Sequence, residues 1–275
     1  MSGAPPCDLV SVVVPTRNSA RTLATCLESV RRQTYPAVEL IVVDNESSDG
    51  TVELARALAD TVFSAGPERS AQRNAGAEAS RGAWLLFVDG DMVLEPSVIR
   101  ESLDAARHAE AVVVPETSFG EGFWARCKAL ERASYVGDET IEAARFFARE
   151  TFIACGGYDA RMSAGEDWDL HARVKANGVR IARIGAFIHH DEGRLRLHRL
   201  VAKKFYYGRE LCHYVGKHPG LARRQVRLVR PAFLRHRRRL LAQPALLCGI
   251  VVMKLCEFGA GGAGFLAARL LRGRP

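Results

Sequence analysis

Residues 84–91 read WLLFVDGD. The first five are apolar, a run typical of a strand that is buried on both faces of a parallel sheet. An acidic turn follows, in which Gly90 lets a ligand approach the backbone between Asp89 and Asp91. Carboxylate oxygens suit Mg²⁺ or Mn²⁺, which proteins hold with one or two carboxylates together with substrate phosphates. The stretch predicts a buried strand that ends in a candidate metal site, with a solvated turn as the plainer alternative.

Strand and helix patterns alternate on both sides of this stretch. Short apolar runs predict strands at 9–14, 40–43, 61–63, 84–88 and 112–114. Apolar residues at helical spacing predict helices at 19–32, 51–59, 70–80 and 96–109. Such alternation predicts a parallel sheet with helices on both faces, and ligands bind beyond the carboxyl ends of its strands. Asp44 and Asp89 both stand at such ends.

A second acidic stretch follows the strand predicted at 40–43. Residues 44–51 read DNESSDGT. Carboxylates at a strand end can accept hydrogen bonds from a nucleobase N–H or from ribose hydroxyls. Asp, Ser and Gly are also the usual residues of turns and helix N-caps, so an ordinary capped turn is the alternative.

The middle of the chain, residues 118–184, has a less regular pattern, with a glycine turn at 156–157 and an edge strand predicted at 180–184. It contains GEDWDL at 165–170. Asp167 is a candidate general base that would take a proton from an attacking hydroxyl. Acidic residues also favour the first turn of a helix, here predicted at 167–176, and the two roles are compatible.

Two histidines follow in the stretch IHHDEGR at 188–194. A histidine just past a strand can complete a metal site. A single histidine is more often structural than a ligand, so His189 and His190 depend on their surroundings for such a role.

The composition indicates one α/β domain with an extension. The chain has 275 residues, of which 48% are hydrophobic and 25% charged, which excludes a disordered protein. The seven cysteines, from Cys7 to Cys256, are scattered without a CxxC pair, which argues against a disulfide framework and indicates a reducing compartment. Residues 1–8 lack the pattern of a secretory leader.

The last part of the chain is basic and then apolar. Most of the net charge of +8 comes from arginines between 223 and 239, and residues 244–271 are strongly apolar. On an insertion scale the apolar side chains there supply roughly −3 to −5 kcal/mol, which Lys254 and Glu257 nearly cancel. We therefore expect an interfacial helix or a shallow re-entrant hairpin, beside arginines that attract anionic lipid. A soluble helical subdomain that packs on the rest of the chain or on a second copy is the alternative.

Four motifs, taken together, resemble those of a known family. Residues 11–18, SVVVPTRN, resemble the opening strand and loop of the inverting family 2 glycosyltransferases, and residues 43–51 resemble their second signature. RNAG at 73–76, Gly82 and FVDGD at 87–91 resemble the third, which ends in a DxD motif, and Glu166-Asp167 resembles the acidic base motif. Order and spacing agree over about the first 195 residues, and the motifs are specific as a set.

The resemblance implies a GT-A fold, an α/β architecture with a mixed sheet, and a hexosyltransferase-like enzyme that uses a nucleoside-diphosphate sugar and Mn²⁺ or Mg²⁺. Asp44 would bind the base, Asp167 would activate the acceptor, and Arg73 would lie near the base or diphosphate. His190 is preferred to His189 as a third metal contact because its HDEG context resembles some members. The donor-binding residues would be Pro15, Thr16, Asp44, Ser47, Arg73, Asp89 and Gly90, and the metal ligands Asp91, Asp89 and His190.

These expectations define a catalytic domain at 1–195 and a basic, then apolar, helical extension at 196–275. The Gln-x-x-Arg-Trp motif of processive members is absent from the sequence, so a single transfer is expected. The extension predicts peripheral contact with the inner face of the cell membrane from the cytoplasm and an acceptor that is lipid-linked or a glycan. Homodimer formation stays open.

Three other functions compete with transfer. A catalytically inactive nucleotide-sugar-binding scaffold at the membrane is disfavoured by the intact Asp91 and Asp167. A nucleic-acid binder would explain the arginines but would leave these carboxylates unexplained. A sugar nucleotidyltransferase is disfavoured because residues 15–18, PTRN, are unlike its glycine-rich basic loop.

Overall fold

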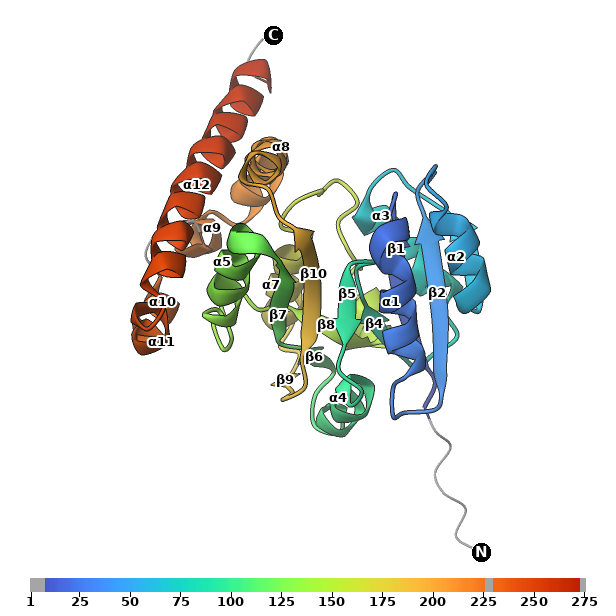
Figure 1. The fold of residues 1–275 in the computed structure, drawn as a ribbon. Coiled ribbons are helices and arrows are strands. Elements are labelled where there is room, and N and C mark those ends of the chain that lie inside the picture. Colours follow the sequence, from blue (N-terminus) through green and yellow to red (C-terminus); the bar gives the residue numbers. More distant parts are fainter. Residues whose placement is uncertain (1–7, 226–229, 273–275) are drawn as a thin grey trace, which may run out of the picture. The chain divides into compact units, whose positions relative to one another are not determined.

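The computed structural model of the chain describes residues 8–225 and 230–272, so Cys7 and Arg227 lie outside the described residues. The chain divides into two compact units. The first unit comprises Met1–Pro115, Ala143–Ala160 and Leu170–His189, and the second comprises Glu116–Glu142, Arg161–Asp169 and His190–Pro275. Figure 1 follows the elements along the chain. The predicted domain boundary after residue 195 stays a prediction.

The first unit is built on a seven-stranded mixed sheet. Its order is β3 (Thr61–Ser64), β2 (Val38–Asp44), β1 (Val10–Thr16), β4 (Trp84–Phe87), β8 (Ala144–Ala148), β6 (Ala111–Val113) and β9 (Ile181–Arg183). The four strands from β3 to β4 are parallel, whereas β8 runs antiparallel to both β4 and β6. The carboxyl ends of β2, β1 and β4 therefore meet at one edge, as the sequence predicts.

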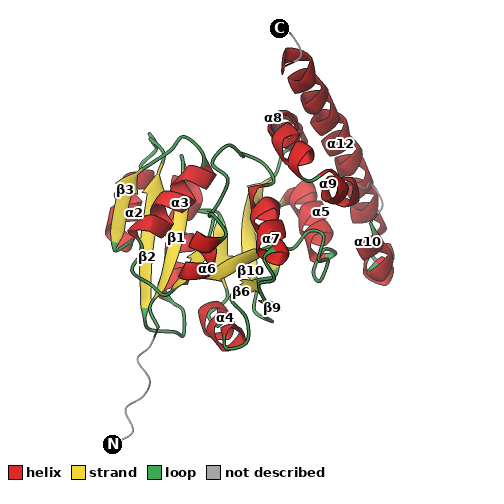
Figure 2. Cartoon of the chain, turned by 180° about the vertical axis from the view of Figure 1, so that it is seen from behind, coloured by secondary structure: helices red, strands yellow, loops and turns green. Residues whose placement is uncertain are grey.

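Alternate residues of the central strands feed two separate cores, because successive side chains in a strand face opposite sides of the sheet. Val12 and Val14 of β1 pack with α1 (Ala20–Arg31), α2 (Thr51–Leu58) and α4 (Val98–Ala106). Val13 packs on the other face with α3 (Arg69–Ala79), α6 (Arg149–Ala154) and the later part of α7 (Glu166–Ala176). Figure 2 views the sheet from the side on which α3 and α6 lie. The short strand β5 (Met92–Leu94) follows the acidic turn.

The second unit combines two neighbouring strands with a group of helices. The strands are β7 (Glu116–Glu121) and β10 (Ile188–Arg194), whose first two residues still belong to the first unit. The helices are α5 (Gly122–Ala133), α8 (Leu197–Lys217), α9 (Pro219–Gln225), α10 (Pro231–Arg235), α11 (Arg237–Leu241) and α12 (Pro244–Arg272). Cys127 and Leu130 of α5 share a core with Leu200 of α8 and with Ile250 and Met253 of α12.

Glycines allow α8 and α12 to pack with their backbones in direct contact. An added Cβ at Gly208 of α8 would overlap the carbonyl of Gly261 in α12, and one at Gly264 would overlap the carbonyl of Phe205. Only glycine permits this approach. Gly261 and Gly264 therefore form part of a helix–helix contact.

The structure corrects three expectations. The irregular middle contains α5, β8 and α6, whose pairing and packing partners are distant in the sequence. The two histidines lie within β10 and not just past a strand. The apolar tail is one continuous helix, α12, so the re-entrant hairpin is wrong. The six described cysteines are free, and the sequence likewise argues against a disulfide framework.

Substitution of Gly76 by Ala should destabilise the first unit. An added Cβ would overlap a methyl group of the buried Val13 and lie 3.2 Å from Val43 Cγ2. Overpacking of this kind costs about 1–3 kcal/mol. Urea unfolding followed by circular dichroism should show the loss, whereas Gly216→Ala, at a helical glycine of α8 with open space around it, should be neutral or mildly stabilising. Equal midpoints for the two variants would contradict the packing of α3 on the sheet.

Candidate active site

The carboxylate of Asp44 lies at the end of β2 and is held by three hydrogen bonds. The Thr16 hydroxyl donates to Oδ1 at 2.9 Å, and the Ser47 hydroxyl donates to the same oxygen at 2.6 Å. The backbone N–H of Ser47 donates to Oδ2 at 2.8 Å. The structure thus brings Thr16, Asp44 and Ser47 together, and it fixes the orientation of the buried Asp44 carboxylate at the sheet edge.

The loops after β1 and β2 hold each other in place. The side-chain oxygen of Asn18 accepts the N–H of Ser48 at 2.9 Å, and the N–H of Asn18 donates to the Ser47 hydroxyl at 2.7 Å. Asn18 and Glu46 take left-handed backbone conformations, with φ of 51° and 52°. Asparagine tolerates this region better than most residues. The asparagine of the opening motif is therefore a structural link between the two loops.

Gln72 of α3 is a site residue that the sequence does not reveal. Its buried side-chain amide donates to the carbonyl of Thr16 at 2.9 Å and to the carbonyl of Val43 at 2.6 Å. It therefore ties the ends of β1 and β2 to each other and to α3. A glutamine inside a helix carries no signal of such a role, because both partners are backbone groups of distant residues.

Asp89 lies among three arginines. Nη2 of Arg73 is 2.6 Å from Asp89 Oδ1, whereas Arg145 of β8 and Arg69 of α3 lie 3.9 and 4.0 Å from Oδ2. Burial alone would raise the pKa of the Asp89 carboxyl, but the charges of Arg73, Arg145 and Arg69 outweigh it and hold the pKa far below its usual range. Three guanidinium groups thus gather around one carboxylate at the sheet edge, and guanidinium groups are well suited to bind phosphate oxygens.

Arg73 itself is buried. Its guanidinium lies 4.9 Å from the centre of the Tyr158 ring, in a cation–π arrangement. Of these neighbours the sequence predicts Arg73 and Asp89 only. Arg69 and Arg145 reach the edge on α3 and β8, and Tyr158 reaches it from the segment after α6.

Asp91 is the predicted metal ligand of the acidic turn. Its side chain is half-buried. A Cβ added to the preceding Gly90 would lie 3.4 Å from the side chain of Ser19. Asp89 faces the arginines, and the assignment of Asp91 as the firmer metal ligand stays a prediction. A divalent ion held by one carboxylate and substrate phosphates fits this donor set. In the described ranges no three His, Cys, Asp or Glu side chains gather into a metal-binding group.

The acidic motif at 165–169 belongs to the second unit and is held by the end of α8. Asp169 is buried, with its Oδ1 2.7 Å from both Lys217 Nζ and His218 Nε2. The indole of Trp168 donates to the carbonyl of Ile141 at 2.9 Å. These contacts fix the first turn of α7 and leave the side chain of Asp167 half-buried.

Tyr214 of α8 supports the same turn. Its ring lies 5.9 Å from that of Trp168, and an added Cβ at Gly165, where φ is +81°, would meet it at 2.9 Å. Tyr214, Lys217 and His218 lie in the predicted extension, and the sequence gives no sign that they contact the acidic motif. Their role becomes visible only once α8 folds back on that motif.

The two histidines point to opposite sides of β10, as successive strand residues do. Nε2 of His190 is 2.8 Å from Glu116 Oε2, and Arg132 Nη1 is 3.0 Å from the same oxygen. Nε2 of His189 is 3.2 Å from Glu95 Oε1. A carboxylate on one ring nitrogen is common for metal-bound histidine. Both histidines meet this condition, so the preference for His190 stays a prediction.

Each unit therefore holds one part of the predicted set. The first unit gathers the donor and metal candidates at one sheet edge, and the second carries Asp167 and His190. The first group comprises Pro15, Thr16, Asp44, Ser47, Arg73, Asp89, Gly90 and Asp91.

Comparison with known families identifies the family of the chain. The model of the family described as "Glycosyl transferase family 2" matches residues 11–167, more than half of the chain. The chain belongs to glycosyl transferase family 2. The match begins in β1 and ends at Asp167, and thus spans all four motifs. The predicted family is confirmed, and the chain is a glycosyltransferase.

Among curated proteins, the chain is similar to the "PGL/p-HBAD biosynthesis glycosyltransferase" of Mycobacterium bovis, with 28% identity over 193 residues that cover 64% of this chain and 73% of that protein. Among solved structures it is similar to the mannosyltransferase PcManGT from Pyrobaculum calidifontis in complex with GDP-Man and Mn²⁺. That likeness has a TM-score of 0.56 and 20% identity, and covers 98% of this chain and 76% of the other.

S. aureus TarS 1–349 in complex with UDP-GlcNAc is also similar, with a TM-score of 0.52, 14% identity, and coverage of 95% of this chain and 92% of that one. The chain spans 54% of a longer TarS chain. At such identities these likenesses concern the fold, and the predicted GT-A fold with a mixed sheet is confirmed.

Substitution of Asp89 by Asn should destabilise the protein, because the buried Arg73 would lose its charge partner. Loss of one partner of a buried pair costs about 3–5 kcal/mol. Because the folded pKa of Asp89 is lowered, its contribution is complete above the unfolded pKa of about 3.9 and is lost as the pH falls below it.

The measurement is urea unfolding of wild type and Asp89→Asn at pH 7 and again below pH 4. The control is Asp104→Asn, which removes an exposed pair with Arg107 on α4 and should change the free energy of unfolding by less than about 0.5 kcal/mol. A constant difference between wild type and Asp89→Asn at both pH values would refute the charge argument.

Proposed function

We propose that this family 2 glycosyltransferase transfers a sugar, with inversion, from a nucleoside-diphosphate sugar to an acceptor hydroxyl or phosphate. The observation that carries the proposal is the sheet edge of the first unit. There Asp44 is held as an oriented acceptor, three arginines surround Asp89, and Asp91 follows two residues later. These groups match the three parts of such a donor, namely nucleoside, diphosphate and bound cation.

The donor would lie along this edge. Thr16 and Asp44 bind the nucleoside, with Ser47 and Pro15 shaping the loop ends, and Asp44 accepts from the base. Arg73 offsets charge on the diphosphate, together with Arg69 and Arg145, which also lie around Asp89. PcManGT holds GDP-Man and TarS 1–349 holds UDP-GlcNAc, so the fold accommodates different bases and sugars. The base and sugar for this chain stay open.

Asp91 would hold Mn²⁺ or Mg²⁺, with His190 as the proposed further contact. When bound, the ion supplies charge stabilisation for the leaving diphosphate. Asp89 faces the ribose or the ion in this proposal, and its contact with Arg73 keeps that guanidinium in position. Gly90 allows the ligand to approach the turn.

Asp167 is the proposed general base. It takes the acceptor proton while the acceptor oxygen attacks the anomeric carbon on the face opposite the diphosphate. The bond from that carbon to the diphosphate oxygen breaks as the new bond forms, which inverts the configuration. Its neighbours suit the role less, because Glu166 and Asp169 are both buried whereas Asp167 is half-buried.

The acceptor is proposed to be lipid-linked or a glycan, used at the cytoplasmic face of the membrane. This proposal is supported by the contacts within the second unit, in which α8 contacts both the acidic motif and the apolar helix α12. A membrane-associated scaffold that binds nucleotide sugar without transfer is the competing function. It would keep donor binding and show neither donor hydrolysis nor transfer.

Asp91→Ala should lose Mn²⁺-dependent donor binding. The measurement is a calorimetric screen of nucleoside-diphosphate sugars with Mn²⁺ or with a chelator. We expect the dissociation constant of the best donor to rise at least about tenfold in the variant, as even outer-shell changes do for metal sites. Asp104→Ala, at an exposed carboxylate of the same unit, should bind like wild type. Equal affinity of Asp91→Ala and wild type would rule out Asp91 as a ligand.

Asp167→Asn should keep donor affinity and lose turnover. Slow hydrolysis of the donor by water reports the reaction without a known acceptor, and general-base loss typically costs about 10²–10⁴-fold. Glu121→Gln, at an exposed carboxylate of the second unit, is the control. Wild-type hydrolysis in Asp167→Asn would remove it from the mechanism, and a wild type that binds donor without hydrolysis or transfer would favour the scaffold.

A further inference from the structure

The charged residues in the apolar part of α12 are turned inward. Lys254 contacts Glu131 of α5 and lies 2.8 Å from Glu257, and Glu257 lies 3.2 Å from Lys128 of α5. The side chains of Lys254 and Glu257 are only 13% and 6% exposed. Lys204 of α8 adds a longer contact with Glu257, at 3.7 Å. The charges that appeared to oppose membrane contact are therefore compensated inside the second unit.

The outward face of α12 is apolar instead. Between residues 244 and 268 every exposed residue is Pro, Ala, Cys, Val, Leu or Gly, which is the reverse of a helix on a water-soluble surface. The exposed large apolar side chains of the helix are Val251, Val252, Leu255, Leu266, Leu270 and Leu271, and Arg269 near its end is exposed as well. At about 100° per residue, Val251, Val252, Leu255, Leu266 and Leu270 lie within about 100° of one another around the helix axis and form a stripe along the helix. Within the described chain α12 is the one helix long and apolar enough to cross a membrane.

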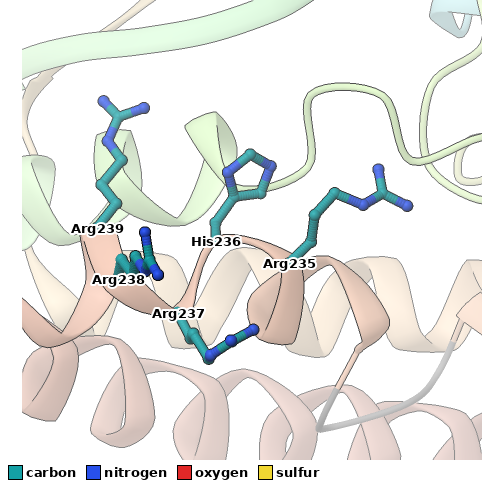
Figure 3. A pocket seen from close by; sticks show the side chains of 5 residues that line it. All are labelled: Arg235, His236, Arg237, Arg238 and Arg239. Atoms are coloured by element: carbon teal, nitrogen blue, oxygen red, sulfur yellow. The ribbon is translucent and has the colours of Figure 1, made fainter.

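A basic cluster adjoins the start of α12. Arg235, His236, Arg237, Arg238 and Arg239, at the junction of α10 and α11, line a hollow of about 380 Å³ (Figure 3). Among the lining residues that the structure describes there is no carboxylate. An exposed apolar stripe next to uncompensated arginines matches the two components of a bilayer surface, acyl chains and anionic headgroups.

The packing of α8 argues against a helix that crosses the bilayer. This helix lies in backbone contact with α12 at Gly208 and Gly264, and it carries the exposed cations Arg199, Lys203 and Arg209. A crossing α12 would carry them into the hydrocarbon, where each costs about 2.5–3.5 kcal/mol or more. A helix that lies in the interface buries the stripe and leaves α8 in water.

We propose that α12 lies in the surface of an anionic bilayer with this stripe in the acyl region, while the arginines at 235 and 237–239 bind headgroup phosphates. The proposal deepens the membrane contact in the proposed function. Since α8 contacts both α12 and the acidic motif, the bilayer would hold Asp167's segment at the membrane, which suits a lipid-linked acceptor.

The test is flotation of the full chain with vesicles of phosphatidylcholine alone or with phosphatidylglycerol, at low and high salt. We expect binding to the mixed vesicles that weakens with salt. The variant Val251→Glu/Leu255→Glu, at positions 52% and 56% exposed, should lose binding. The matched control is Ile153→Glu on α6, a residue 57% exposed, which should bind like wild type. Equal binding by the double variant and the control would overturn the proposal.

The second arm tests the arginines. Arg238→Gln/Arg239→Gln should weaken binding to the mixed vesicles by about 30-fold, from about 1 kcal/mol per basic residue at the surface. Free inorganic phosphate at millimolar concentration should not compete, because the stripe would still favour the bilayer. Full competition by phosphate would identify a soluble-anion site and overturn the lipid assignment.

A third outcome is a second copy on the stripe. Light scattering that shows a dimer, dissociated by Val251→Glu/Leu255→Glu while vesicles are ignored, would replace the bilayer with that copy. Donor binding measured on the same samples separates this proposal from the transferase. Lost vesicle binding with intact donor binding defeats the membrane surface alone, whereas vesicle binding without any donor defeats the transferase alone.

Discussion

Arg73 carries a full positive charge with no exposed surface, and the carboxylate of Asp89 at 2.6 Å is what makes that burial tolerable. Much of the first unit serves this pair. Gly76 lets α3 approach the sheet closely enough to deliver Arg73, and the antiparallel β8 brings Arg145 to the same edge. Asp89 is in turn fixed by the end of β4. The positive edge that would receive a diphosphate is thus a consequence of how α3 and β8 pack.

The parallel register of β2, β1 and β4 is what could be predicted from the sequence. Their apolar runs predict buried strands. Because these strands are parallel, the acidic residues that follow two of them, Asp44 and Asp89, lie at the same edge of the sheet. The family motifs add roles to these residues because their order and spacing are specific. For this reason the helices and strands of the first 114 residues, apart from the short β5, lie where their patterns place them, to within about two or three residues.

The rest depends on contacts between residues far apart in the chain. The pattern of β8 is short, and its place between β4 and β6 is set by antiparallel pairing with both. Gln72 binds two backbone carbonyls, and His218 binds Asp169 from another helix, so neither has a local signature. Gly261 and Gly264 form a seam with Gly208 and Phe205 of α8, and this contact also depends on residues far apart in the chain.

The ion cluster of Lys128, Glu131, Lys254 and Glu257 has a geometric consequence for α12. A helix advances by about 100° per residue, so rotation by a single position would take Lys254 and Glu257 out of their partners' reach. The glycine seam against α8 tolerates no such rotation either, because only glycine fits there. The ion cluster and the glycine seam together fix the rotation of α12 about its own axis. The exposed apolar stripe of α12 therefore faces one fixed direction relative to α5 and α8.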